Sequence, residues 1–160
     1  MIFVLARAVT YSVLFIGFLL ILLPGQVLQR WGMVRPAGIG PIEVLGLVIG
    51  VAGAALALWC ILTFALIGRG TPAPFDPPRR LVIAGPYRYV RNPMYLGAAL
   101  ALLGAAVFYR SSALALYTAA FLLVTHLFVL LYEEPALTQT FGEDYQNYRG
   151  RVRRWLPRIS

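Results

Sequence analysis

The chain has 160 residues, of which 60% are hydrophobic, and it carries a formal net charge of +8. A soluble domain is usually about half apolar, so this composition argues against a soluble protein and predicts a single membrane domain. In a membrane protein, excess arginine marks loops on the cytoplasmic side, near anionic lipid, so no nucleic-acid partner is expected. The single cysteine, Cys60, excludes a disulfide framework, and with one histidine no metal site is expected.

Four apolar runs predict about four transmembrane helices. They cover residues 2–23, 42–67, 94–108 and 113–132. The first run lacks the features of a signal peptide and is interpreted as a retained helix that ends at Pro24 and Gly25. The third is short of the ~20 residues a span needs, but it gains length if its helix begins near Pro93. Small residues in the second run predict a helix-packing face: Gly46, Gly50 and Gly53.

Charge placement predicts the orientation of the chain. With an even number of spans, both termini and the 68–93 loop lie on one side, which holds all arginines except Arg30, Arg35 and Arg110. The positive-inside rule places that side in the cytoplasm. Both termini and the 68–93 loop are therefore expected on the cytoplasmic face, so two regions far apart in the sequence can form one site there.

Prolines predict where the backbone leaves helical geometry. The 71–86 loop contains five prolines and is expected to be extended rather than helical. Asn92 and Glu134 each precede a proline, so both are expected to be extended, and Glu134 is expected to end the fourth helix.

The tail predicts an amphipathic cytoplasmic helix from about residue 135 to 148, ending near Gly150. This helix either lies on the membrane or folds over the cytoplasmic mouth of the bundle. Its apolar and aromatic residues recur at helical spacing: Leu137, Phe141, Tyr145 and Tyr148. Trp155 follows between two arginines, which is typical of a residue at the membrane interface. The expected fold is therefore an all-α integral membrane protein with about four transmembrane helices and this C-terminal helix.

A polar segment, residues 85–97, leads into the third helix. A helix that begins at Pro93 directs free N–H groups and its positive dipole end toward Arg91 and Asn92, which favours a carboxylate or a phosphate. Gly97 lets another backbone or a flat ligand approach closely. The alternative is that the arginines and tyrosines here only anchor the chain at lipid headgroups.

Glu133 and Glu134 follow the fourth run, where acidic groups are costly unless they are solvated or paired. They are either a stop signal that pairs with the arginine-rich tail, or carboxylates that hold an ammonium or another cationic ligand. His126 lies two turns earlier on roughly the same helix face. It is either a functional residue or a neutral histidine that is hydrogen-bonded to a neighbouring helix.

Together these residues resemble the isoprenylcysteine carboxyl methyltransferase family and its phospholipid methyltransferase relatives. The matching parts are Gly85-Pro86-Tyr87, Arg91-Asn92-Pro93-Met94-Tyr95-Leu96-Gly97, Glu133-Glu134, Phe141-Gly142 with Tyr145 and Tyr148, and Arg154-Trp155-Leu156-Pro157. The resemblance covers residues 76–157, about half the chain. It implies a methyltransferase core at 76–157, preceded by a helix pair at 1–67, that uses S-adenosylmethionine without a Rossmann domain.

The resemblance also implies a protein of a bacterial inner membrane whose termini and active site are cytoplasmic. Its cofactor pocket would lie between residues 85–97 and residues 133–148, and a lipophilic substrate would reach it sideways from the bilayer. Its candidate cofactor-binding residues are Tyr87, Val90, Arg91, Asn92, Tyr95, Gly97, Glu133 and Glu134. Arg91, Glu134 and His126 are the candidate catalytic residues. Asn92 stands where the eukaryotic enzymes have histidine, so a general-base role at that position is excluded.

The expected function is methyl transfer from S-adenosylmethionine to a lipophilic, membrane-resident acceptor, with S-adenosylhomocysteine as product. The acceptor stays open between an isoprenylcysteine-like carboxylate, which needs no base, and a phospholipid-like amine, which needs one from His126 or a glutamate. The alternatives are a non-catalytic membrane scaffold or lipid-binding protein, and an NADPH enzyme of the sterol-reductase type. The expected partners are the bilayer and a small lipophilic molecule; no pattern indicates an oligomeric state.

Overall fold

A computed structural model describes residues 10, 17–31, 36, 38–68 and 80–158. Within these ranges every regular element is a helix. In chain order they are η1 (Gly17–Leu22), α2 (Leu23–Arg30), α3 (Pro41–Thr63), η2 (Phe64–Gly68), η3 (Gly85–Arg88), α4 (Pro93–Phe108), α5 (Ser112–Phe128), η4 (Val129–Glu133) and α6 (Glu134–Arg151). η1, η2 and η4 are π-helical, and η3 is a single 3₁₀ turn.

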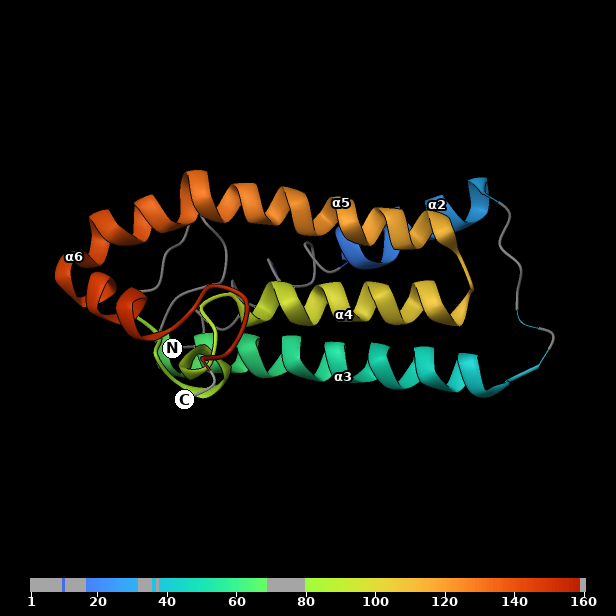
Figure 1. Ribbon diagram of the computed structural model, residues 1–160, viewed down its shortest axis with the longest axis horizontal. Coiled ribbons are helices and arrows are strands. Elements are labelled where there is room, and N and C mark those ends of the chain that lie inside the picture. Colours follow the sequence, from blue (N-terminus) through green and yellow to red (C-terminus); the bar gives the residue numbers. More distant parts are fainter. Residues whose placement is uncertain (1–9, 11–16, 32–35, 37, 69–79, 159–160) are drawn as a thin grey trace.

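Helices α3, α4 and α5 run side by side, and α6 bends away at one end of this bundle (Figure 1). The tightest contact joins α3 to α4 through glycines. A Cβ atom added at Gly97 would lie 2.7 Å from the Ala57 backbone nitrogen, and one at Gly46 would lie 2.5 Å from the Phe108 nitrogen. The predicted helix-packing face on α3 is confirmed, because at Gly46 and Gly53 an added Cβ would lie 2.5 Å or less from the α4 backbone, although Gly50 has room for one.

Among the residues that the structure describes, two helices are long and apolar enough to cross a membrane, Pro41–Thr63 and Ser112–Arg151, and Pro93–Phe108 is a shorter apolar helix. Only 22% and 28% of their most apolar windows are buried. Large side chains such as Leu45, Val48 and Val51 are therefore more than 45% exposed along α3. Contiguous apolar surface of this kind is rare on soluble monomers and fits a lipid-facing helix.

Three predicted helix boundaries require correction. The first run was expected to end at Pro24, but the chain continues as α2 to Arg30, because proline is tolerated in the first turn of a helix. Much of that run lies outside the described residues, as does most of the 71–86 loop. The prediction that this loop contains no helix was wrong at its end, because Gly85–Arg88 forms a 3₁₀ turn with Pro86 at its start.

The predicted stop at Glu134 was also wrong. Glu134 has φ −64° and ψ −42°, and the helix continues from α5 through η4 into α6. The wider π-helical turn of η4 immediately precedes Pro135, and such turns accommodate the missing N–H and the ring of a proline. The tail helix is instead broken at Gly142, whose φ of 52° and ψ of −124° are not helical. It ends at Arg151, one residue after the expected Gly150.

At the opposite end of the bundle, a buried acid secures the start of α3. The Glu43 carboxylate accepts hydrogen bonds from the Gly40 backbone N–H at 2.9 Å and from Arg110 Nε at 2.9 Å. Arg110 belongs to the turn between α4 and α5, where its φ is 48°. This ion pair ties the α4–α5 turn to α3, far from the end at which α6 folds back.

Candidate functional site

A small pocket lies where α6 folds back over the end of the bundle, and its volume is about 40 Å³. The loop before α4, the end of α3 with η2, and the η4–α6 junction all contribute to its wall. The lining residues are Phe64, Leu81, Val82, Tyr87, Arg91, Asn92, Val129, Glu133, Glu134, Leu137, Tyr145 and Tyr148. The pocket therefore joins residues 64–92 to residues 129–148, two regions that are separated by 36 residues in the sequence.

The centre of this site is an ion cluster of one carboxylate and two guanidinium groups. Arg91 Nη1 lies 3.0 Å from Glu134 Oε1, and Arg154 donates to both carboxylate oxygens of Glu134, at 2.7 and 2.9 Å. The side chains of Arg91 and Glu134 are each only 8% exposed. Because two cations share one anion, the cluster carries a net positive charge.

Glu134 is ionised in this cluster. It begins α6, whose polar sequence places it outside the apolar spans. Burial raises the pKa of a carboxyl, but the Arg154 hydrogen bond and the charges of Arg91 and Arg154 outweigh burial and lower the pKa of Glu134. The same hydrogen bond raises the pKa of Arg154. The arginines therefore hold a charged carboxylate in a largely dry site.

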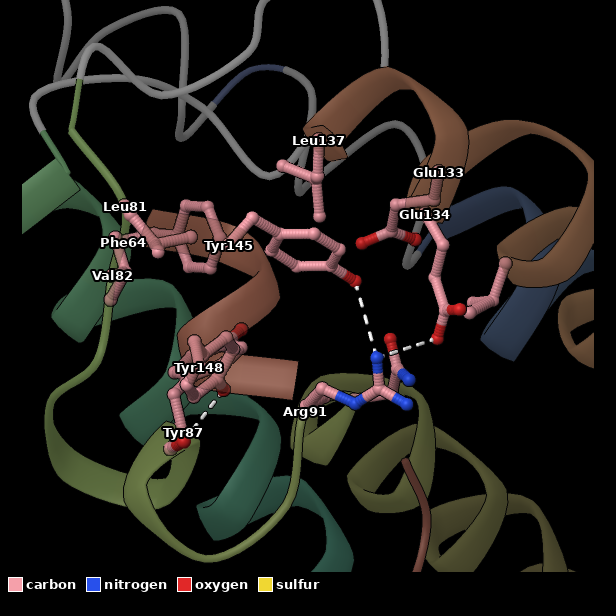
Figure 2. Close-up of a pocket in the computed structure, with 12 residues that line it drawn as sticks. Phe64, Leu81, Val82, Tyr87, Arg91, Glu133, Glu134, Leu137, Tyr145 and Tyr148 are labelled. Carbon is pink, nitrogen blue, oxygen red and sulfur yellow. Dashed lines mark hydrogen bonds and ion pairs between the residues drawn. The ribbon is translucent and has the colours of Figure 1, made fainter. Parts of the chain in front are cut away.

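Arg91 has unused hydrogen-bonding capacity. Its Nη1 donates to Tyr145 Oη at 3.4 Å in addition to the Glu134 ion pair (Figure 2). Its Nε is buried and has no hydrogen-bond partner within the part of the chain that the structure describes. A buried donor without a partner is destabilising, and its presence at a pocket is typical of a site that binds an acceptor group.

Glu133 has a different environment from its neighbour. Its Oε2 accepts a hydrogen bond from Tyr95 Oη at 3.1 Å. In Figure 2 its carboxylate points into the space bordered by Leu137, Tyr145 and the Arg91–Glu134 pair. Glu133 therefore presents a carboxylate to the pocket without a direct ion pair to the Arg91 and Arg154 guanidinium groups.

Aromatic residues form the other wall of the pocket. Tyr148 Oη donates to the Tyr87 carbonyl at 2.7 Å, and the Tyr87 ring packs edge-on against Phe64 with centroids 5.0 Å apart. Tyr145 and Tyr148 share an apolar cluster with Leu137 and Phe141. The predicted helical face of the tail is thus confirmed, and it packs over the pocket. Burial raises the pKa of Tyr145 and of Tyr148, so both phenols stay protonated.

The loop that carries Arg91 and Asn92 is paired with the C-terminal tail. Val90 forms an isolated parallel bridge with Arg153, and the Arg91 N–H donates to the Arg153 carbonyl at 2.9 Å. The Asn92 side chain donates to the Arg154 carbonyl at 3.3 Å. Asn92 was expected to be extended because it precedes a proline, but this was wrong: its φ of −123° and ψ of 53° are non-helical without being extended.

Of the eight candidate cofactor-binding residues, five line this one pocket: Tyr87, Arg91, Asn92, Glu133 and Glu134. Tyr95 contacts the site through its bond to Glu133. Val90 is buried in the bridge to the tail, and Gly97 packs against the α3 backbone, so neither lines the pocket. The binding and catalytic roles assigned to these residues stay predictions.

His126, the third candidate catalytic residue, also lies outside the pocket lining. Its Nδ1 accepts a hydrogen bond from Trp155 Nε1 at 3.0 Å, so its partner belongs to the C-terminal tail rather than to a neighbouring helix. Trp155 was expected at the membrane interface, but it is partly buried and packs against the cluster that contains Tyr95 and Phe121.

Sequence reasoning missed four residues that surround the ion cluster: Leu137, Tyr145, Tyr148 and Arg154. For the first three, the helical spacing and a position over the mouth of the bundle were predicted, but these side chains were not named as site residues. Arg154 belongs to a motif that was noted without a role. A buried Glu134 demands a cation, and pairing with the arginine-rich tail was the signal that pointed to it.

A family model described as phospholipid methyltransferase matches residues 42–144, which include α3, α4, α5 and most of the pocket. Comparisons with curated proteins and with solved structures found no match. The matched region is well over half of the chain and contains Arg91, Asn92, Glu133 and Glu134. The chain belongs to the phospholipid methyltransferase family.

Proposed function

We propose that this protein transfers a methyl group from S-adenosylmethionine to a lipophilic acceptor that resides in the membrane. The observation that carries the proposal is that Glu133 lines the same pocket as Arg91, whose buried Nε has no hydrogen-bond partner among the described residues. The family match supports methyl transfer, and the exposed apolar helices support a membrane location.

The donor set suits the amino-acid end of such a cofactor. Arg91 offers a buried N–H to a carboxylate, and Glu133 offers a carboxylate to an ammonium group. Tyr87, Tyr145 and Tyr148 offer rings that can pack on a flat base or face a cation. The pocket volume of about 40 Å³ is well below the ~300 Å³ or more of typical ligand pockets, so binding requires these side chains to move apart.

When bound, S-adenosylmethionine supplies a methyl group on a positively charged sulfur. The residues around it have to align donor and acceptor, exclude water, and suit a cation that loses its charge. Arg91 would bind the carboxylate of the cofactor and Glu133 its ammonium group, and together they would fix the orientation of the cofactor. Glu134 keeps the Arg91 guanidinium in place through the 3.0 Å ion pair.

The acceptor determines whether a base is needed. A carboxylate acceptor of the isoprenylcysteine type attacks without losing a proton, whereas a protonated amine must first lose one. Glu133 is a candidate for this base because it lines the pocket, whereas His126 does not. Nδ1 of His126 is occupied by the Trp155 bond, so His126 would act only through its other nitrogen.

We further propose a single domain with four spans and cytoplasmic termini, in which residues 1–67 form a helix pair and residues 76–157 the methyltransferase core. Arg91, Arg153 and Arg154 gather at the pocket end of the bundle, and Arg110 lies at the other end with Glu43. That asymmetry supports a cytoplasmic pocket under the positive-inside rule. A bacterial inner membrane remains the proposed location.

A titration tests the proposed cofactor. Protein purified in detergent is titrated with S-adenosylhomocysteine and, separately, with NADPH, while thermal unfolding is monitored. Stabilisation by S-adenosylhomocysteine alone supports the transferase, because a ligand that binds only the folded state raises the unfolding temperature. Stabilisation by NADPH alone favours a reductase, and no shift with either ligand favours a scaffold or lipid-binding protein.

A second experiment addresses the acceptor. Membrane lipid extracts and synthetic isoprenylcysteine are incubated with a labelled methyl donor and the wild-type protein, and labelled products are separated by chemical class. Label in a base-labile methyl ester indicates a carboxylate acceptor, and label in a quaternised or methylated headgroup indicates an amine. A matched reaction with the Arg91→Ala variant shows which label depends on the pocket.

A further inference from the structure

A short segment that follows α6 contacts the pocket region. Residues 152–155, here called the C-terminal strap, do so at three separate points. The strap lies beyond residue 144, where the family match ends. None of its residues was among the candidate site residues.

The first point is main-chain pairing. The Arg91 N–H donates to the Arg153 carbonyl at 2.9 Å, and the Asn92 N–H donates to the Arg154 carbonyl at 3.3 Å. Arg91 and Asn92 lie between η3 and α4 and belong to neither helix. The strap therefore supplies hydrogen-bond partners for a short irregular segment that has no helical partners of its own.

The second and third points are contacts of two side chains, Arg154 and Trp155. Arg154 binds both oxygens of Glu134 at 2.7 and 2.9 Å, a bidentate arrangement that fixes the plane of the carboxylate. Trp155 Nε1 donates to His126 Nδ1 at 3.0 Å, on α5. The strap thus connects the α4 entry, α5 and the start of α6 within four residues.

We propose that Arg154 and Trp155 are positioning residues for the pocket, acting through Glu134 and through the strap. This inference rests on the proposed function. Arg154 orients Glu134, and Glu134 in turn orients the Arg91 guanidinium, whose Nε has no partner in the part of the chain that the structure describes. Trp155 anchors the strap to α5, so the main-chain bonds to Arg91 and Asn92 stay formed.

The strap is tested with Trp155→Phe, which retains an aromatic ring but loses the N–H donor, and with Arg154→Lys, which retains the charge but loses the bidentate geometry. Arg158→Gln is the matched control, because Arg158 is exposed and binds the Gly150 carbonyl outside the site. Two readouts are measured on the full chain in detergent. One is hydrogen exchange of the Arg91 and Asn92 amides, and the other is the affinity for S-adenosylhomocysteine.

We expect both strap variants to speed amide exchange at residues 91 and 92 and to weaken S-adenosylhomocysteine binding about tenfold, which corresponds to the loss of one hydrogen bond. Arg158→Gln should change neither. Unchanged exchange and affinity in both strap variants would overturn the proposal, as would weaker binding with unchanged exchange.

The exchange readout separates this inference from the proposed function. If the wild-type protein does not bind S-adenosylhomocysteine, the proposed cofactor is wrong. Faster exchange in the strap variants would still support the role of Arg154 and Trp155 in positioning residues 91 and 92. Rescue distinguishes positioning from general destabilisation. Lower temperature should restore binding in a variant that is only less stable, and it should leave the tenfold loss in a variant that is mispositioned.

Discussion

Glu133 and Glu134 are adjacent in the sequence, but their carboxylates have different partners. Glu134 lies within 3.0 Å of guanidinium nitrogens from Arg91 and Arg154, whereas Glu133 accepts a hydrogen bond from the Tyr95 hydroxyl at 3.1 Å. One acid is therefore committed to the protein's own cations, and the other faces the pocket. The two should respond differently to the same substitution.

Glu134→Gln should destabilise the fold as well as weaken binding. The change leaves two arginines at a largely buried site without their anion, which costs about 3 kcal/mol for a buried pair. Glu133→Gln removes a charge that has no direct partner among these arginines, so unfolding should change little while affinity for S-adenosylhomocysteine falls at least tenfold. Thermal unfolding and calorimetric titration of both variants check this, and equal loss of stability in the two would contradict the division of roles.

Arg91→Lys should reduce S-adenosylhomocysteine affinity by tenfold or more although the charge is kept. Lysine has one nitrogen centre and cannot both pair with Glu134 and offer a second, differently placed N–H to a ligand. Arg88→Gln is the control, because Arg88 is an exposed residue of the preceding turn. Calorimetry on both variants is the measurement. A full-affinity Arg91→Lys protein would show that Nε of Arg91 has no ligand.

Acid should weaken the fold through Glu134. Its pKa is lowered from the ordinary value of 4.5, so its stabilising contribution is complete above about pH 4.5 and is lost as the pH falls through the folded-state pKa. The unfolding temperature of the wild type should therefore fall more steeply below pH 4.5 than that of Glu134→Gln. Parallel curves for the two proteins from pH 7 to pH 3 would mean that the ion cluster contributes no pH dependence.

Gly97→Ala should destabilise the α3–α4 pair. The added Cβ would lie 2.7 Å from the Ala57 nitrogen and 2.8 Å from the Gly53 carbonyl oxygen, both of them backbone atoms that cannot move aside alone. Overpacking of this kind costs about 1–3 kcal/mol. Gly50→Ala is the matched control, because its nearest contact would be 3.8 Å away. Comparable unfolding temperatures for the two variants would argue against the glycine contact.

Gly142→Ala should be harmful for a different reason. No atom lies within 4 Å of the added Cβ, but the φ of 52° with ψ of −124° is a conformation that alanine adopts at a cost of about 1–3 kcal/mol. Gly150→Ala also meets no atom, and its φ is ordinary. It should leave stability unchanged or slightly raised. Thermal unfolding of both variants is the measurement. An unchanged unfolding temperature for Gly142→Ala would mean that the backbone at Gly142 does not require glycine.

The sequence was most informative where residue type and position act locally. Proline chemistry predicted the start of α4 at Pro93, and glycine spacing predicted the face through which α3 packs. The prediction that the helix ends at Glu134 failed, because the helix continues through the π-helical turn η4 and accommodates Pro135. No residue pattern in the chain predicts that turn.

The site was predictable only in part, because its closure depends on contacts between distant residues. Arg91 and Glu134 were singled out from their neighbours in sequence, and the structure brings them within 3.0 Å. The bond between Trp155 and His126 joins residues whose individual interpretations, an interface anchor and an intramembrane histidine, gave no hint of each other. Such a pairing depends on where α6 folds back, and that in turn depends on Gly142.

The helix that begins at Ser112 runs unbroken through η4 to the kink at Gly142, and this has a consequence for how the site is placed relative to lipid. From Ser112 to Glu133 it has 22 residues, which at ~1.5 Å each measure about 33 Å, close to the ~30 Å thickness of the hydrocarbon layer. The number of residues in this helix therefore determines how far Glu133 and Glu134 lie above the acyl chains. A one-residue insertion before Val129 would swing both acids by about 100° around the axis, whereas four residues would nearly restore their direction but lift them by about 6 Å.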